Sequence, residues 1–235
     1  MKRNLFKSVE PYPVVPGVYT WENCLDVPNG IVDIMNSEVD DWKDSISKAD
    51  VKNNDSLKSV YGANGPIRFD PEVNFHKEES KTFLKQVQRN ALDKAADYMQ
   101  IYPDVEMEVN WMETWQYITY KPPKHMTFHS DNHAVRDPRT NKHHIAPYLR
   151  RFTILTYLND DFEGGEFVFP DLRVRIKPEP GLLVAFPSSQ FYLHKVEPVI
   201  SGTRYAMVNW MTVQGMPTKA EVDKEIGDKY GINVY

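Results

Sequence analysis

Cysteine is almost absent from this chain of 235 residues, in which Cys24 is the single example. One cysteine forms no disulfide within the chain, which favours a reducing, intracellular setting. No apolar run approaches the ~18 residues of a membrane-spanning helix. The first residues, MKRNLFKSVEPYP, carry positive charge, but the apolar stretch of a secretory signal does not follow them. We therefore expect a cytoplasmic protein with no membrane partner.

A strong excess of charge of one sign is also missing. The net charge of −5 is small and of the wrong sign for a dedicated nucleic-acid-binding protein, so we expect no nucleic-acid partner. Internal repeats and low-complexity tracts are absent as well. With 41% hydrophobic and 26% charged residues, the composition is that of a globular protein. The length fits one sizeable domain, and the oligomeric state is left open.

Proline, in contrast, is abundant. The 17 prolines crowd the first 30 residues and the stretch from Pro122 to Pro198, which favours loops and strands over a helical bundle because proline breaks helices. Apolar residues recur at three- and four-residue spacing in 31–42 and 75–103, which predicts two helices. A long loop is expected over about residues 50–70, and a short helix in the tail, 216–235.

After Pro103 the pattern changes to short runs rich in β-branched and aromatic residues, each bounded by Gly, Pro, Asn or Asp. The clearest runs are RRFTILTYLND, GGEFVFP, LRVRIKP, GLLVAFP, QFYLHKV and RYAMVNWMTV. They predict a mainly β, α+β fold in which helices pack against a β-sandwich or jelly-roll barrel. We expect a helical support region over 1–104, a jelly-roll core over 105–215 and a tail over 216–235.

Two of the seven histidines lie in or at the end of predicted strands, whereas the other five are expected on the surface. His129 and Asp131 are two residues apart, so in a strand their side chains point to one face. His194 ends the predicted strand QFYLHKV. Two imidazoles and one carboxylate suit iron(II), because they leave three coordination positions open. A zinc site is the metal-based alternative.

Arg204 follows the turn predicted at Ser201-Gly202 and opens the apolar run YAMVNW. A strand that returns from this turn would carry Arg204 deep into the barrel that holds His194. There a guanidinium can bind the far carboxylate of a dicarboxylate through two hydrogen bonds. A surface role is less favourable, because an unpaired charge in an apolar run is costly. A zinc hydrolase has no need of this arginine.

Together these segments resemble the prolyl 4-hydroxylase branch of the 2-oxoglutarate- and iron(II)-dependent dioxygenases, over about Trp115 to Met211. The pieces that carry the resemblance are Tyr120, His129-Ser130-Asp131, TYLND followed by FEGGEFVFP, VRIKPEPGLLVAFP, His194 and GTRYAMVNW. The resemblance implies a double-stranded β-helix, a jelly-roll and cupin-like fold. It also implies that His129, Asp131 and His194 bind iron(II), and that Arg204 anchors 2-oxoglutarate. It further implies that Tyr157 and Tyr120 hydrogen-bond the co-substrate and that Trp210 lines the pocket.

The function implied by this resemblance is hydroxylation of an unactivated C–H bond by dioxygen, with succinate and carbon dioxide as co-products and with ascorbate as a further candidate cofactor. Position 4 of a peptidyl proline is the favoured target, and a peptide or protein is favoured over a small molecule. The alternatives are another peptidyl residue, a small molecule, or a non-catalytic β-barrel binding module. The loops at about 50–70, with Tyr61 and Arg68, and 132–148 are expected at the substrate entrance; solvated loops without a role are the alternative.

Overall fold

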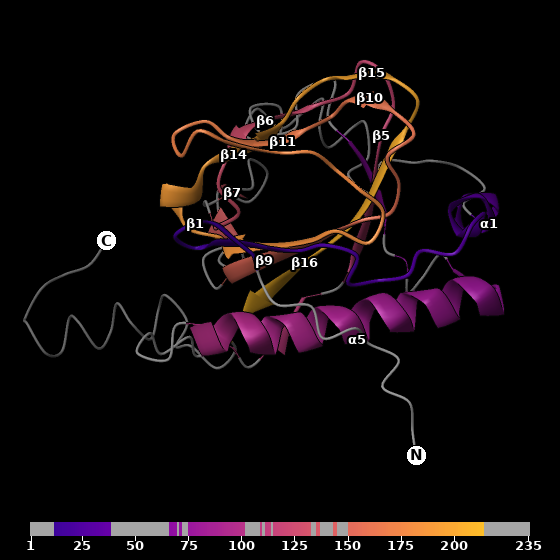
Figure 1. Cartoon of the computed structure of the whole chain (residues 1–235), viewed down its shortest axis with the longest axis horizontal. Helices are drawn as coiled ribbons and strands as arrows, with labels where there is room; N and C mark the ends of the chain where they lie inside the picture. Colours follow the sequence, from indigo (N-terminus) through magenta and orange to yellow (C-terminus); the bar gives the residue numbers. More distant parts are fainter. Residues whose placement is uncertain are drawn as a thin grey trace, which may run out of the picture.

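Two layers of strands and one long helix make up most of the molecule (Figure 1). The computed structural model describes residues 12–38, 66–69, 71, 75–101, 109, 111–113, 115–132, 135–136, 143–144 and 150–213. A large sheet lies between the helix and a smaller sheet. One face of the large sheet is buried against the helix, and the other face is buried against the smaller sheet. This layering gives the protein two apolar cores.

The large sheet has eight strands, all paired antiparallel. Seven of them lie side by side in the order β1 (Tyr12–Val15), β2 (Val18–Trp21), β13 (Leu183–Pro187), β9 (Arg150–Tyr157), β16 (Arg204–Thr212), β5 (Gln116–Tyr120) and β3 (Ile67–Phe69). The eighth, β4 (Trp111–Met112), also pairs with β16. The proline of β1 is tolerated because this strand lies at the sheet edge, where a missing N–H costs little.

The small sheet has the strand order β12 (Val174–Ile176), β11 (Phe167–Phe169), β14 (His194–Val196) and β6 (Met126–His129). A short 3-10 helix, η2 (Gln190–Tyr192), leads into β14. Two further ladders pair β10 (Glu163–Gly164) with β15 (Val199–Ser201) and β7 (Val135–Arg136) with β8 (His143–His144). Among the described strands these ladders remain separate and do not close into one continuous barrel.

Strand β16 shows how the large sheet serves both cores. Met207 and Met211 pack in the cluster that contains the helix α5 (Glu78–Ile101), whereas Val208 and Trp210 pack in the cluster between the two sheets. Residues of opposite parity point to opposite faces of a strand. Because both faces are buried, β16 appears in the sequence as a nearly continuous apolar run.

Both predicted helices are present, as α1 (Ile31–Ser37) and α5. Residues before 105 contribute more than helices, since β1, β2 and β3 extend the large sheet. The strand predicted for QFYLHKV is wrong in its first half, which forms η2. Strand β3 occupies the end of the predicted loop 50–70; Tyr61, most of both entrance loops and the tail lie outside the described residues. None of the helices that the structure describes is both long and apolar enough to cross a membrane.

Candidate metal centre

The two strand histidines lie directly opposite each other. Strands β6 and β14 are antiparallel neighbours, and their register places His194 across from His129. The centroids of the two imidazole rings are 4.4 Å apart. Two residues that lie across a ladder project to the same face, so both rings point into the space between the sheets. The short helix η2 places His194 by ending just before β14 begins.

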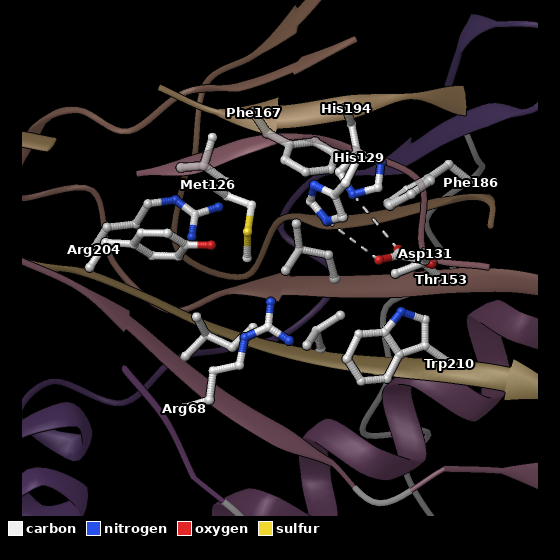
Figure 2. Close-up of a pocket in the computed structure, with 15 residues that line it drawn as sticks. Arg68, Met126, His129, Asp131, Thr153, Phe167, Phe186, His194, Arg204 and Trp210 are labelled. Carbon is white, nitrogen blue, oxygen red and sulfur yellow. Dashed lines mark hydrogen bonds and ion pairs between the residues drawn. The ribbon is translucent and has the colours of Figure 1, made fainter. Parts of the chain in front are cut away.

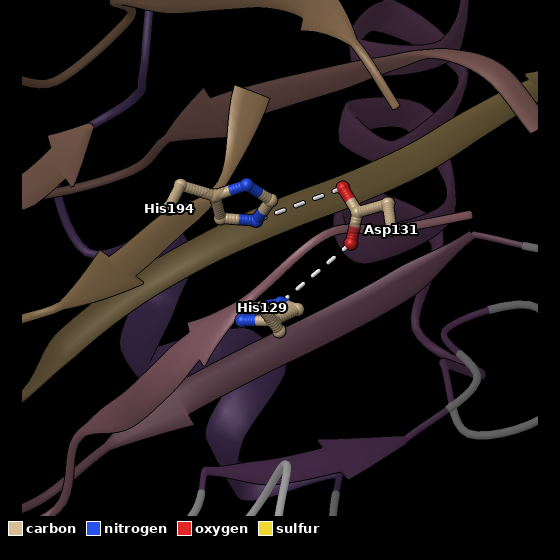
Figure 3. Close-up of side chains that lie close together, drawn as sticks. All are labelled: His129, Asp131 and His194. Atoms are coloured by element: carbon tan, nitrogen blue, oxygen red, sulfur yellow. Dashed lines mark ion pairs between the residues drawn. The ribbon is translucent and has the colours of Figure 1, made fainter. Parts of the chain in front are cut away.

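Asp131 completes the cluster from the turn that follows β6 (Figure 3). Its Oδ1 lies 3.7 Å from His129 Nε2, and its Oδ2 lies 3.8 Å from His194 Nε2. One ligand atom from each of the three residues lies within 4.8 Å of the others. In the described part of the chain, this is the one group of His, Cys, Asp or Glu side chains with such spacing. The structure therefore brings together all three predicted metal ligands.

The backbone fixes which nitrogen of each ring is available. Nδ1 of His129 is 2.7 Å from the carbonyl oxygen of Thr127, and Nδ1 of His194 is 3.0 Å from that of Tyr192. A carbonyl can only accept, so each Nδ1 carries the hydrogen and donates it. Nε2 of each neutral ring then presents its lone pair toward Asp131. Burial, and next the neighbouring His194, lower the pKa of His129 to about 3, so its ring is neutral at physiological pH.

Asp131 is held by the large sheet. The Thr153 hydroxyl on β9 donates to Asp131 Oδ2 at 2.6 Å, and Ser188 Oγ lies 3.0 Å from the same hydroxyl. Arg150 Nη1 donates to the Asp131 carbonyl oxygen at 3.2 Å. Burial alone would raise the pKa of Asp131, but the two imidazoles, Arg150 and Thr153 outweigh it and lower the pKa. Asp131 is therefore an anion that accepts one fixed hydrogen bond on Oδ2, which leaves Oδ1 as the better metal ligand.

The cluster forms part of a pocket between the two sheets (Figure 2). The pocket encloses about 410 Å³, including the space at its open mouth. Its lining is mostly apolar. The residues that line it are Arg68, Ile118, Tyr120, Met126, His129, Asp131, Thr153, Leu155, Phe167, Phe186, His194, Val196, Arg204, Val208 and Trp210. A concave, largely apolar site with a few polar groups is typical of small-molecule binding.

Arg204 enters this pocket from the start of β16 and is 1% exposed. Within the described part of the chain, its Nε and Nη2 have no hydrogen-bond partner. The turn glycine Gly165 makes room for it: Gly165 has a φ of 67°, and a Cβ there would lie 3.0 Å from Arg204 Cδ. A buried guanidinium with two unused donors is costly unless an anion binds it. Arg204 thus fits the distal carboxylate of a dicarboxylate.

Two tyrosines flank Arg204, whose Cζ lies 4.9 Å from the ring centroids of both Tyr120 and Tyr157. Tyr120 also lines the pocket, whereas Tyr157 lies beside the guanidinium and is not part of the lining. Burial raises the pKa of Tyr157 to about 12, against the opposing charge of Arg204. Its phenol is therefore protonated at neutral pH and able to donate a hydrogen bond to a carboxylate.

Trp210 forms part of the pocket wall. The Arg150 guanidinium covers this indole, with Cζ 3.7 Å from the ring centroid, and pairs with both carboxylate oxygens of Glu113 at 2.7 Å. Sequence patterns did not single out Arg150, Thr153 or Ser188. A threonine inside a strand is ordinary, and only the pairing of β9 with its neighbours reveals that Thr153 reaches Asp131.

The donor set fits iron(II). Two imidazole nitrogens and one carboxylate form the arrangement that leaves open positions in non-haem iron oxygenases. Zinc accepts the same three ligands, but a zinc hydrolase gives no reason for Arg204 to be buried in the same pocket. Comparison with known proteins separates these two alternatives.

Residues 115–212 match the family model described as the 2OG-Fe(II) oxygenase superfamily. The chain is 33% identical to rat (Rattus norvegicus) prolyl 3-hydroxylase 2 over 124 residues, which are 45% of this chain and 18% of that protein. It is 29% identical to a PKHD-type hydroxylase of Crocosphaera subtropica over 143 residues, 60% of this chain and 55% of that one. The matched region thus spans less than a fifth of the prolyl 3-hydroxylase and about half of the PKHD-type protein.

Among solved structures, the fold is similar to a viral collagen prolyl hydroxylase from Paramecium bursaria chlorella virus 1, with a TM-score of 0.53 at 18% identity over 83% of this chain and 96% of that one. It is also similar to a prolyl hydroxylase of Trichoplax adhaerens, with a TM-score of 0.58 at 18% identity over 83% of both chains. These likenesses confirm the predicted jelly-roll class. Residues 115–212, which contain His129, Asp131 and His194, thus match the 2OG-Fe(II) oxygenase superfamily, whose cofactor and co-substrates are iron(II), 2-oxoglutarate and dioxygen.

Proposed function

We propose that this protein is a dioxygenase that hydroxylates an unactivated C–H bond and converts 2-oxoglutarate into succinate and carbon dioxide. In this proposal His129, Asp131 and His194 bind the iron(II). The observation that carries it is the convergence of one ligand atom from each of these three residues, all within 4.8 Å of one another, in a pocket that also holds Arg204. Bound iron(II), together with 2-oxoglutarate and dioxygen, supplies the oxidising power for the reaction.

Arg204 is proposed to bind the distal carboxylate of 2-oxoglutarate. Its burial and its two donors without a partner among the described residues support this role. Charge-assisted hydrogen bonds from a fixed guanidinium hold a carboxylate in one orientation. Tyr157 and Tyr120 flank the guanidinium and are proposed to add hydrogen bonds from their hydroxyl groups. Arg204 thereby sets how far the co-substrate reaches toward the three ligands.

The apolar side chains of the pocket are proposed to exclude water around the reacting groups. Phe167 and Phe186 pack against the ring of His194, with centroids 5.0 Å and 4.9 Å away. Trp210 closes the wall below Asp131 (Figure 2). A dry site strengthens the electrostatic contacts inside it and protects reactive species from side reactions. The pocket must also position one C–H bond of the substrate close to the reacting group, because the rate depends on the distance and orientation of the reacting atoms.

For the primary substrate we propose a peptidyl proline, hydroxylated at C4. The support comes from the sequence resemblance and from the names of the two relatives described above, both of which are hydroxylases. An extended, proline-rich peptide is already ordered before it binds, so an open pocket mouth can accept it at low entropic cost. The prolyl 3-hydroxylase relatives favour C3 as a second candidate position.

The test is succinate release from 2-oxoglutarate by the purified protein, with and without iron(II), ascorbate and proline-rich peptides. We expect release that requires iron(II) and rises with a peptide whose mass increases by one oxygen. Amino-acid analysis against 3- and 4-hydroxyproline standards then assigns the position. Iron-independent succinate release would contradict the proposed reaction, and turnover stimulated only by peptides without proline would contradict the proposed substrate.

A further inference from the structure

A second buried arginine faces the pocket from the edge of the large sheet. Arg68 lies at the centre of β3, which pairs with β5 so that Arg68 is opposite Ile118. Ile118 points into the core between the sheets, and the residue opposite it on the neighbouring strand points the same way. Arg68 is 9% exposed and lines the pocket. Figure 2 shows its guanidinium directed into the cavity from a different wall than that of Arg204.

The orientation of Arg68 is fixed by the protein. Its Nη1 donates to Gln116 Oε1 at 3.0 Å, and Gln116 lies on the adjacent strand with its side chain on the same face as Ile118. This bond holds the guanidinium on the face of the large sheet that borders the pocket.

The proposed function assigns the other charges of the pocket. Iron(II) and Arg204 would take the two carboxylates of 2-oxoglutarate, which gives Arg68 no part in holding the co-substrate. Among the described residues that line the pocket, Asp131 is the one carboxylate, whereas Arg68 and Arg204 are both cations. In the part of the wall that the structure describes, a primary substrate therefore meets guanidinium groups. Guanidinium groups match carboxylates in geometry and in charge.

We propose that Arg68 binds a carboxylate of the primary substrate, so that preferred substrates carry a negative charge close to the C–H group that is hydroxylated. This inference rests on the proposed function and names the chemistry of its substrate. Two sources can supply such a group: an acidic side chain next to the target residue of a peptide, or the terminal α-carboxylate of a peptide that ends at the target.

Binding is measured by calorimetry on protein loaded with 2-oxoglutarate and manganese(II), which occupies such ligands without turnover. Three probes share one proline-containing sequence: a peptide blocked at both ends with Glu beside the proline, the same peptide with Gln, and the Gln peptide ending in a free carboxylate at the proline. We expect at least one carboxylate probe to bind about tenfold more tightly than the blocked Gln peptide. The probe that gains identifies the source of the carboxylate.

Variants then connect this preference to Arg68. Arg68→Gln should remove the preference for the carboxylate probe, and Arg68→Lys should keep part of this preference. Arg68→Glu should reverse it, so that a peptide with Lys in place of Glu binds more tightly. Arg175→Glu is the matched control, because Arg175 is exposed on the small sheet, away from the pocket, and changes charge by the same amount. The preference should survive in that control, and the affinity for 2-oxoglutarate should be unchanged in Arg68→Lys.

Equal binding of the acidic and neutral probes by the wild-type protein, or no measurable binding of any of them, overturns the inference without any variant. An Arg68→Gln protein that weakens all probes alike also overturns it. The proposed function is checked separately by the visible absorption of the wild-type protein with iron(II) and 2-oxoglutarate. If that complex does not form, both proposals fail; if it forms and the probes bind alike, only the role of Arg68 is wrong.

Discussion

Replacing Thr153 by valine tests how the protein holds Asp131, the proposed carboxylate ligand. The two side chains have nearly the same shape, so the substitution removes the hydroxyl and little else. The hydrogen bond of 2.6 Å to Asp131 Oδ2 is lost, and Ser188 Oγ loses its neighbour at 3.0 Å. Thr153 is 1% exposed, so water does not readily replace the hydroxyl. A hydrogen bond to a charged group is worth about 1.5–3 kcal/mol.

The expected result is a weaker metal site. Groups that orient a metal ligand typically contribute a factor of about 10–100 in affinity, or about 1.4–2.7 kcal/mol. We expect this loss for Thr153→Val in anaerobic titrations with iron(II) and with cobalt(II), whose visible spectrum reports on the ligand geometry. The cobalt(II) spectrum should change shape as well as midpoint, because the carboxylate becomes free to rotate.

Thr156→Val is a close control. Thr156 lies on the same strand, is also 1% exposed, and points to the opposite face. Its hydroxyl has no hydrogen-bond partner among the residues described here by the structure. We expect unchanged metal affinity and equal or higher thermal stability in this variant. Metal affinity that falls alike in both variants, or in neither, would refute the role assigned to Thr153.

Four other substitutions give sharp outcomes. His194→Ala should abolish iron(II) binding and succinate release while the protein still melts cooperatively; a variant that retains full turnover refutes the ligand assignment. Arg204→Gln should raise the KM for 2-oxoglutarate by about 100-fold or more, because a buried ion pair is lost, and unchanged KM would contradict the anchor. Gly165→Ala should raise the same KM, because its Cβ would lie 3.0 Å from Arg204 Cδ and the residue has positive φ; an unchanged KM would show that Arg204 does not need this space. Burial raises the pKa of the Cys24 thiol to about 11. The free energy of unfolding should therefore be independent of this thiol below its unfolded pKa of ~8.5 and should fall as the pH rises from there toward 11. Urea melts of the wild-type protein and of Cys24→Ala should diverge in that pH range, and parallel curves would contradict this effect of burial.

The convergence of His129, Asp131, His194 and Arg204 on one pocket could be predicted because each residue has a local signal. His129 and Asp131 are two residues apart, although β6 ends at His129 and Asp131 lies in the turn that follows, and Arg204 opens an apolar run. The helices were visible for the same reason, since α5 repeats its apolar residues every three or four positions. These features depend on residues that are close in the sequence, and the spacing of such residues can be read directly from the sequence.

Features that depend on long-range pairing could not be predicted. Thr153 reaches Asp131 only because β9 lies where the turn after β6 approaches the large sheet. The sequence predicts Arg68 in a loop at the substrate entrance, whereas Arg68 lies on a strand of three residues. That strand is too short to show a periodic pattern and forms by pairing with β5. The segment Gln190–Tyr192 contains residues that favour strands, but it forms a 3-10 turn that leads into β14 and sets His194 opposite His129.

The central claim is that His129, Asp131 and His194 hold one iron(II) beside a 2-oxoglutarate anchored by Arg204. It is tested most directly by anaerobic titration with iron(II), in the presence and absence of 2-oxoglutarate, followed by visible absorption. We predict a charge-transfer band that appears only when both are present, disappears in His194→Ala, and needs much more 2-oxoglutarate in Arg204→Gln. No band with the wild-type protein, or the same band in His194→Ala, would contradict the account.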